Sequence, residues 1–216
     1  MKINETLYLF KEKGILDSNT YLIKEKLTVL IDPGRENYLE PRLKEMQDDG
    51  IDPEDIDLII ITHLHPDHCG ATAALKEVSG AKVALHSSQR EYFDVMAEES
   101  RKFLGTCSIE KFNADLVLGE RLSLGTLELD IMHTPGHSPC SICFYVEVKK
   151  ILICGDLVFE RGVGRTDLPF GDAEELKNSI EMVSGRDTKL LLPGHGARIE
   201  GRVNLERNYK FVKAVL

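Results

Sequence analysis

Short apolar runs recur along this chain and are separated by polar turns, a pattern typical of β-strands. Each run is rich in Val, Ile, Leu or aromatic side chains and is bounded by Gly, Pro, Asp or Asn. The predicted strands span residues 6–10, 19–24, 27–32, 56–62, 81–86, 127–133, 141–148, 150–156 and 188–194. The first two strands are expected to form a hairpin. The strands 141–148 and 150–156 are expected to form another, which turns through Lys149 and Lys150.

Helical periodicity lies between these strands. Apolar residues recur at i, i+3 and i+4 in 71–78, 39–46 and 176–183, which places them on one face of a helix. The segments 87–105 and 202–216 are further helix candidates. The strands come in two batches that are each followed by helices, which predicts a mixed α/β fold with two packed sheets and helices outside. With no repeat or linker, the 216 residues are expected to form one domain, 1–216.

Composition and charge reduce the number of classes of function that fit this chain. The formal charge is −9, and no Lys/Arg cluster forms the basic footprint of a nucleic-acid-binding protein. The opening MKINETLYLF is unlike a secretory signal, and no apolar run reaches the ~18 to 20 residues of a membrane span. The 5 cysteines are scattered, so we expect reduced thiols and a cytoplasmic protein. The pair Cys140 and Cys143 enters a strand, where i and i+3 face opposite ways, and is read as structural. Cys69 and Cys154, which flank polar candidates, receive no role.

The stretch ITHLHPDHCG, residues 61–70, concentrates three histidines and a carboxylate directly after an apolar strand. His63 and His65 are two residues apart, so in extended chain they point the same way and can bind one ion. Pro66 ends the strand, and Asp67 and His68 follow on the next turn, where a second ion is expected. Imidazole nitrogen and carboxylate oxygen suit zinc, iron or manganese.

Further candidates follow other strands. MHTPGHS places His137 in a Pro-Gly turn, and LLLPGHG repeats this arrangement at His195. ICGD ends a buried strand with Asp156. Glycine permits the backbone angles and the close approach that such loops need. His86 and His133 are interpreted as structural residues rather than ligands.

The motifs THLHPDH, TPGHS, the Gly-Asp of ICGD and PGHG, in this order, resemble the metallo-β-lactamase superfamily, as do the preceding SNTYLI and LIDPG. The resemblance implies a four-layer αββα sandwich with a metal site along one edge. It further implies two divalent metal ions, zinc first with iron or manganese as alternatives. By resemblance, the ligands of the first ion are His63, His65 and His137, those of the second are Asp67, His68 and His195, and Asp156 bridges both.

Two divalent ions held close together can share a hydroxide whose pKa is lowered toward neutrality. We therefore expect a hydrolase in which Asp67 and Asp156 are the catalytic carboxylates that hold the hydroxide and the ions. The expected substrate is a small molecule, an anionic acyl thioester or ester, and lactones or phosphoesters are less favoured. A metal-binding protein without turnover is disfavoured, and the oligomeric state is open.

The segment GVGRTDLPFGD, residues 162–172, resembles the glyoxalase II-like branch of the superfamily and also the related persulfide dioxygenases. Arg165 is a candidate anchor for an anionic substrate group, because a guanidinium pairs well with a carboxylate. An equal alternative is that Arg165 and Asp167 pair with each other. The dioxygenases would use one iron, expected here at His65, His137 and Asp156. PGHG favours the hydrolases.

Overall fold

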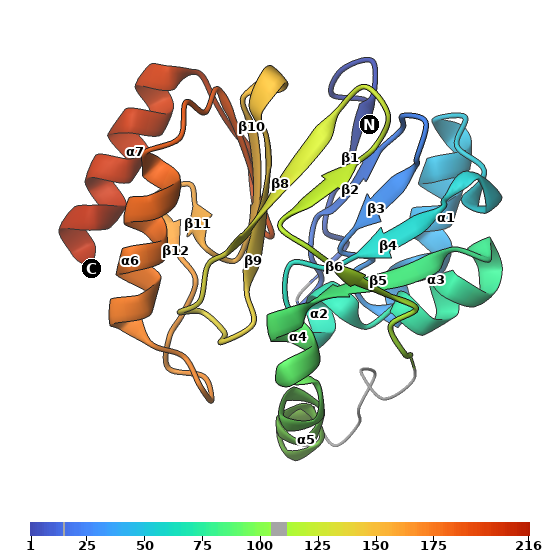
Figure 1. The fold of residues 1–216 in the computed structure, drawn as a ribbon, viewed down its shortest axis with the longest axis horizontal. Helices are drawn as coiled ribbons and strands as arrows, with labels where there is room; N and C mark the ends of the chain where they lie inside the picture. The colour runs from blue at the N-terminus through green and yellow to red at the C-terminus, as the bar shows by residue number, and fades with distance from the viewer. Residues whose placement is uncertain (15, 105–111) are drawn as a thin grey trace.

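Two six-stranded β-sheets face each other across the middle of the molecule, and helices cover their outer faces (Figure 1). The structure, a computed structural model, describes residues 1–14, 16–104 and 112–216. Within these residues the strand order is β1-β2-β3-β4-β5-β6 in the first sheet and β14-β13-β10-β9-β8-β7 in the second, and β11 and β12 form a separate ribbon. The expected αββα sandwich is confirmed.

The first sheet begins with two antiparallel pairings and continues in parallel. Its strands are β1 (Leu7–Phe10), β2 (Thr20–Ile23), β3 (Val29–Ile31), β4 (Leu58–Ile60), β5 (Lys82–His86) and β6 (Leu116–Leu118). The predicted antiparallel pairing of the first two strands is present, with Leu7 opposite Ile23. Because parallel strands have both faces covered, β4 reads in the sequence as a continuous apolar run.

The second sheet is antiparallel except where β10 pairs with β13. Its strands are β7 (Arg121–Ser123), β8 (Glu128–His133), β9 (Ile142–Val146), β10 (Ile151–Gly155), β13 (Leu190–Pro193) and β14 (Ile199–Glu200), and the ribbon consists of β11 (Val158–Phe159) and β12 (Gly162–Val163). The predicted β9–β10 hairpin turns through the 3-10 helix η4 (Glu147–Lys149), and Lys150 takes the left-handed conformation with φ 57°.

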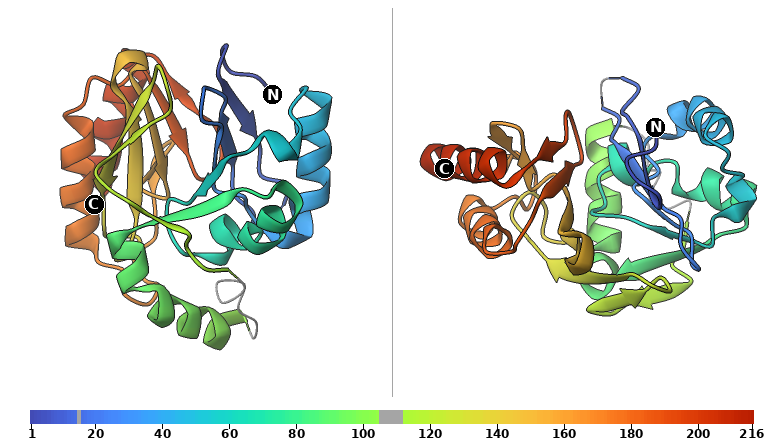
Figure 2. Two further views of the ribbon diagram at one scale, coloured as in Figure 1. Left: turned by 45° about the vertical axis from the view of Figure 1, so that its right-hand side comes forward. Right: turned by 90° about the horizontal axis from the view of Figure 1, so that it is seen from above.

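Helices form the two outer layers. They are α1 (Leu39–Asp48), α2 (Pro66–Cys69), α3 (Thr72–Ser79), α4 (Ser87–Glu91), α5 (Phe93–Leu104), α6 (Ala173–Ser184) and α7 (Arg202–Val215), with the 3-10 turns η1 (Glu36–Tyr38) and η2 (Pro53–Asp55). Helices α1 and α3 lie outside the first sheet, and α6 and α7 lie outside the second, as the view from above also shows (Figure 2). The predicted helix 87–105 divides at Tyr92, and Gly105 lies outside the described residues.

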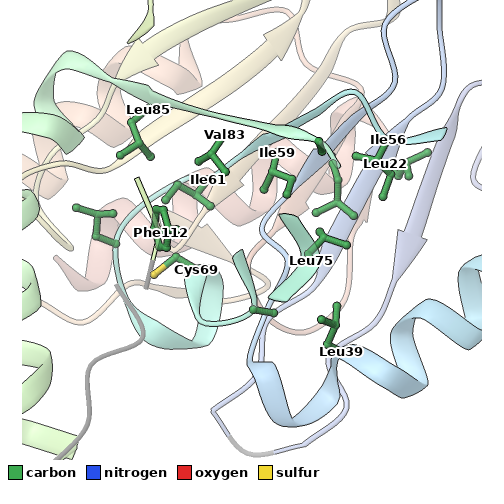
Figure 3. Packing of buried hydrophobic residues seen from close by; sticks show 14 of the residues in the cluster. Leu22, Leu39, Ile56, Ile59, Ile61, Cys69, Leu75, Val83, Leu85 and Phe112 are labelled. Carbon is green, nitrogen blue, oxygen red and sulfur yellow. The ribbon is translucent and has the colours of Figure 1, made fainter. Parts of the chain in front are cut away.

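Alternation along the strands distributes the apolar side chains among three clusters. In and just after β4, Ile59 and Ile61 pack outward against Leu75 and the other side chains beneath α1 and α3 (Figure 3). Leu58 and Ile60 point the other way and pack between the two sheets. A third cluster joins the second sheet to α6 and α7. Each fully buried Leu or Ile contributes about 1.5–3 kcal/mol, so the three clusters hold the four layers together.

Three sheet-edge strands, β6, β7 and the two-residue β14, were absent from the sequence prediction. Leu116 and Val117 of β6 are 44% and 55% exposed, and the strand has only 3 residues. In β7, Arg121 and Ser123 are exposed. Edge strands of this kind lack the apolar run that the prediction relied on, and their partners in the sheet stabilise them instead.

The two sheets are joined at the edge where β4, β10 and β13 end. The Ile142 N–H of the second sheet donates to the Thr62 carbonyl after β4 at 2.8 Å. The Asn19 N–H donates to the Gly194 carbonyl at 2.7 Å. Loops that are distant in the sequence therefore meet at one edge of the sandwich.

Candidate metal centre

A first triad consists of His63, His65 and His137, and one ring nitrogen of each lies within 4.8 Å of the others. The chain after β4 is extended here, so the two earlier histidines leave it on one side. His65 Nδ1 and His137 Nε2 are 2.9 Å apart. His137 reaches the same place from the turn after β8. The structure thus brings together the three side chains expected at a first ion.

A second triad consists of Asp67, His68 and His195, whose potential ligand atoms also lie within 4.8 Å of one another. Pro66 begins α2 and places Asp67 and His68 on its first turn, and the His68 ring centroid lies 4.1 Å from that of His63 of the first triad. His195 follows β13, and its Nε2 lies 3.3 Å from Asp67 Oδ2 and 3.4 Å from His68 Nε2. This set matches the expectation for a second ion.

Asp156 lies between the two triads. Its Oδ2 is 3.6 Å from His137 Nε2 and 3.4 Å from His195 Nε2, and its Oδ1 is 3.2 Å from His68 Nε2. One carboxylate therefore contacts histidines of both triads, which is the geometry expected of a bridging ligand.

Two buried atoms in this cluster have no hydrogen-bond partner among the described residues. They are His63 Nε2 and Asp156 Oδ1, the second of which has an ion-pair contact with His68 Nε2 at 3.2 Å. An unsatisfied buried polar atom is costly, and proteins usually pair it or coordinate it to a metal. The donor set of imidazole nitrogens and carboxylate oxygens also fits zinc or iron. The residues present therefore fit a pair of divalent cations.

Hydrogen bonds orient the histidines of the first triad through neutral groups. The Thr62 hydroxyl lies 3.1 Å from His63 Nδ1, and it donates its own proton to Asp32 at 2.7 Å. His137 donates from Nδ1 to the Arg165 carbonyl at 2.8 Å. These bonds leave the other ring nitrogen of each imidazole facing the centre.

The second triad is oriented by carboxylates. His68 Nδ1 lies 2.8 Å from Asp32 Oδ2, and both side chains are buried. His195 Nδ1 lies 2.9 Å from Glu12 Oε2, and the Gly196 N–H donates to the other Glu12 oxygen. An outer carboxylate fixes the ring orientation of a ligating imidazole and makes it more basic.

Burial and the charges inside the cluster shift the pKa values of several of these histidines in opposite directions. Burial, reinforced by the neighbouring imidazoles, lowers the pKa of His63 well below its usual range and lowers that of His65 to about 3. Burial also opposes charge on His195, but hydrogen bonds to Asp156 and Asp67 outweigh it and raise its pKa to about 10.

Burial likewise opposes charge on His68, but Asp156 and then Asp32 raise its pKa well above the usual value. For Asp67 the opposing effect of burial is outweighed by His68, and the pKa falls to about 2. Protons on the histidines of the second triad thus balance the negative charge of the carboxylates. Bound cations would replace these protons and balance the same charge.

Close approach explains two glycines of the motifs. A Cβ on Gly194 would lie 2.2 Å from Asp156 Oδ1 and 2.6 Å from a carbon of the His68 ring. A Cβ on Gly155, which has φ +49°, would lie 2.6 Å from Thr62 Oγ1. Any side chain at either position would displace the cluster, so the glycines in PGHG and ICGD are required by packing.

A pocket of about 640 Å³ opens onto this centre. Residues of both triads line one side, and Leu64, Met96, Phe159 and Leu168 contribute an apolar wall. An apolar pocket with a few polar groups at one end is typical of a small-molecule site.

Arg165 also lines this pocket, and its side chain forms two hydrogen bonds with Asp167, at 2.6 and 2.7 Å. The pairing alternative described for this loop is thus present in the structure. His86 and His133 stack on each other, with ring centroids 6.0 Å apart, and neither belongs to the groups of potential ligands found among the described residues.

The cysteines in the described residues are buried thiols, namely Cys69, Cys140, Cys143 and Cys154. Cys140 packs in the cluster under α1 and α3, whereas Cys143 packs in the cluster under α6 and α7. Cys143 lies in β9 and Cys140 lies in the turn before it, and the two pack in different clusters. Burial raises the pKa of Cys143 to about 12, which makes it a poor nucleophile.

The orienting roles of the carboxylates Asp32 and Glu12 were not predicted from the sequence. Asp32 carried a signal, because it follows a buried strand in LIDPG, just as Asp156 follows one in ICGD. Glu12 carried none, since it lies in a polar loop and contacts a histidine 183 positions away.

The sequence pattern of the metallo-beta-lactamase superfamily matches residues 14–195, and the chain belongs to this superfamily. It is 33% identical over 180 residues to hydroxyacylglutathione hydrolase GloC of Haemophilus influenzae, an alignment that covers 80% of this chain and 82% of that protein. It is 35% identical over 184 residues to a probable metallo-hydrolase of Methanocaldococcus jannaschii, covering 83% of this chain and 87% of the relative.

Among solved structures, that of TTHA1623 in a di-iron-bound form is similar, with a TM-score of 0.76 and 30% identity, covering 94% of this chain and 98% of that one. The class of protein is therefore a metallo-hydrolase of the metallo-β-lactamase superfamily. Within the described residues, no helix has the length and apolar character needed to cross a membrane.

Proposed function

We propose that this chain hydrolyses a small anionic acyl thioester or ester at a dinuclear metal centre. The observation that carries the proposal is Asp156, which contacts histidines of both triads while its buried Oδ1 forms no hydrogen bond in the described residues. The name of the relative GloC, a hydroxyacylglutathione hydrolase, favours a thioester over a lactone or phosphoester.

In this proposal His63, His65 and His137 hold the first ion, and Asp67, His68 and His195 hold the second. The ions, when bound, supply Lewis acidity and lower the pKa of a bound water toward about 7. Zinc is the first candidate, with iron or manganese as alternatives, because mixed nitrogen and oxygen ligands suit each of them. We further propose that the protein works in the cytoplasm.

The residues of the chain have separable tasks. Asp156 and Asp67 fix the positions of both ions and accept hydrogen bonds from the attacking water. Neutral His63 and His65 present nitrogen lone pairs without first losing a proton, because burial holds their pKa values low. The apolar wall of Leu64, Met96, Phe159 and Leu168 keeps bulk water from the acyl group and strengthens the electrostatic interactions beside it.

Elemental analysis of the purified protein, combined with two assays, tests the proposal. We expect two metal ions per chain and release of free thiol from acyl thioesters. The second assay follows oxygen consumption with a glutathione persulfide. A protein that carries a single iron, consumes oxygen and leaves thioesters intact would overturn the proposal in favour of a persulfide dioxygenase.

A further inference from the structure

Arg35 lines the pocket, and its backbone is tied to the metal centre. The preceding residue, Gly34, donates its N–H to the His68 carbonyl at 2.9 Å. The Arg35 N–H donates to Asp17 Oδ1 at 3.0 Å. The loop therefore holds Arg35 in a fixed place relative to the second triad.

The support beneath Arg35 is itself rigid. Asp17 forms an ion pair with Arg42 at 2.8 Å, and both side chains are 0% exposed. Arg42 also donates to the Pro33 carbonyl at 2.9 Å. Gly34 has φ +76°, and a Cβ there would lie 2.5 Å from Arg42 Nη1. A buried ion pair supports a surface loop here, which preorganises whatever the next residue binds.

The charged side chains around the pocket differ in whether they are already paired. Glu99 pairs with Lys102 at 2.9 Å, and Arg165 pairs with Asp167. The acidic residues Asp67 and Asp156 belong to the metal centre. Arg35 is a half-buried residue, and its guanidinium has no hydrogen bond or ion pair with any side chain in the described part of the chain.

A second polar group in the same pocket also lacks a partner. Ser100 of α5 is 7% exposed, and its buried hydroxyl has no hydrogen-bond partner among the described residues. Unpaired polar groups set in an apolar wall are the features by which a pocket fixes the orientation of its ligand. A ligand that carries an anion and a hydrogen-bonding group on an apolar body would complement this pocket.

We propose that Arg35 is the residue that binds the anionic end of the substrate and thereby selects charged over neutral acyl thioesters. The inference rests on the proposed function, and it assigns to Arg35 the task for which the sequence had suggested Arg165. A guanidinium offers two parallel donors to a carboxylate, and partial burial strengthens that contact.

The kinetic test uses two thioesters with the same hydroxyacyl group. One is carried on glutathione, which bears carboxylates, and the other on N-acetylcysteamine, which is neutral. For Arg35→Gln we expect KM for the glutathione thioester to rise about 10- to 100-fold, as for loss of one charge-assisted hydrogen-bonded contact. The KM for the neutral thioester should change by less than about 2-fold, because it makes no such contact.

Three companion variants sharpen the test. Arg35→Lys keeps the positive charge but lacks the paired donors of the guanidinium, so its KM for the glutathione thioester should rise less than that of Arg35→Gln. Arg90→Gln removes the same charge from an exposed position on α4 and serves as the matched control. Arg165→Gln tests the rival anchor. A larger loss in Arg165→Gln than in Arg35→Gln, or an equal loss on both thioesters, would overturn the assignment.

A binding measurement separates this inference from the proposed function. The metal-loaded protein is titrated calorimetrically with an S-alkyl glutathione, a thioether that cannot be hydrolysed. If no thioester is cleaved but Arg35→Gln still weakens binding about 10-fold or more, the proposed reaction fails and the anchor stands. If the wild type does not bind the thioether, or Arg35→Gln binds it equally well, the anchor fails whatever the reaction. Metal content and Tm equal to wild type confirm that the variant is folded.

Discussion

The two triads of the candidate metal centre lie side by side but have opposite surroundings. In the first triad the outer partners are neutral, the Thr62 hydroxyl and the Arg165 carbonyl. In the second triad they are the carboxylates of Asp32 and Glu12. Burial and the neighbouring His137 lower the pKa of His65 to about 3, whereas hydrogen bonds to Asp156 and Asp67 outweigh burial and raise that of His195 to about 10.

This contrast indicates how similar ligands can bind two ions differently. A neutral imidazole is ready to coordinate, whereas a protonated one must first lose its proton. The outer carboxylates compensate, because they make the imidazoles better donors once a cation has displaced the protons. We therefore expect the first triad to bind its ion with little dependence on pH, and the second to bind in competition with protons.

The largest effect is expected for Asp156→Ala, which removes the carboxylate common to both triads. Turnover should fall by about 10³-fold or more, because several kcal/mol of transition-state stabilisation depend on correctly held ions. Steady-state kinetics and metal analysis check this. The exposed Asp48→Ala on α1 is the control. An Asp156→Ala protein with near-normal activity and two ions per chain would refute the shared role.

A smaller effect is expected for Glu12→Gln, which keeps the shape of the side chain and removes its charge beside His195. Affinity at the second triad should fall about 10- to 100-fold, the usual effect of losing an outer-shell partner. Affinity at the first triad should not change. Zinc titration against a competing chelator measures both, and the exposed Glu5→Gln is the matched control. Equal weakening at both positions would contradict the contrast between the triads.

The dependence of zinc binding on pH tests the same contrast without a mutation. At pH 6 to 8 the raised pKa of His195, about 10, keeps it protonated in the metal-free protein. Each proton that zinc displaces makes its affinity rise about tenfold per pH unit over this range. His63, whose pKa is well below its usual range, and His65, with a pKa of about 3, are already neutral, so these two ligands should add no pH dependence to binding at the first triad.

Two phases of zinc binding should therefore be seen, with the weaker one gaining affinity as the pH rises. His195→Ala should remove that phase, which identifies it. Two phases with the same pH slope would show that the protonation difference has no effect on binding.

The smallest effect is expected for His133→Gln, which changes a histidine outside both triads. His133 is exposed and bonds to the Pro139 carbonyl at 2.8 Å. Metal content should equal that of wild type, and the free energy of unfolding should change by less than about 1 kcal/mol, as is usual at an exposed site. Elemental analysis and urea unfolding measure both. Loss of an ion would place this histidine in the centre.

Much of the architecture was predictable because buried strands and helix faces appear in the sequence as regular patterns of apolar residues. The run before Thr62 alternates between two apolar clusters, and both faces of β4 are buried, so the strand is visible as a continuous apolar segment. The edge strands β6 and β7 bury little, and no such segment marks them. Helix 87–105 was expected as one element, and the break at Tyr92 follows a capping box at His86 and Gln89, a local signal that the apolar spacing does not contain.

The candidate ligands could be identified for a similar reason. Imidazoles and carboxylates directly after apolar strands have few structural explanations, so His63, His65 and Asp156 stand out in the printed sequence. Their division into two sets was expected by resemblance, and in the structure the same side chains gather at one place, where His63, His68 and Asp156 also form a group that crosses the two sets. No sequence pattern distinguishes Glu12 and Arg35, because charged residues that are exposed or half-buried are common in loops.

The sequence by itself determined the class of fold and the residue types that gather at one edge of it. Buried strands appear in the sequence as apolar segments, and the candidate ligands directly follow these segments. Only the tertiary structure decided which charges are paired, and hence that Arg165 is bound to Asp167 while Arg35 has no such partner in the described chain. It also decided that only the second triad has histidines whose outer ring nitrogens are hydrogen-bonded directly to carboxylates. The physical reason is that pKa and charge pairing depend on distances of a few ångströms between loops, and these distances exist only after the two sheets have packed together.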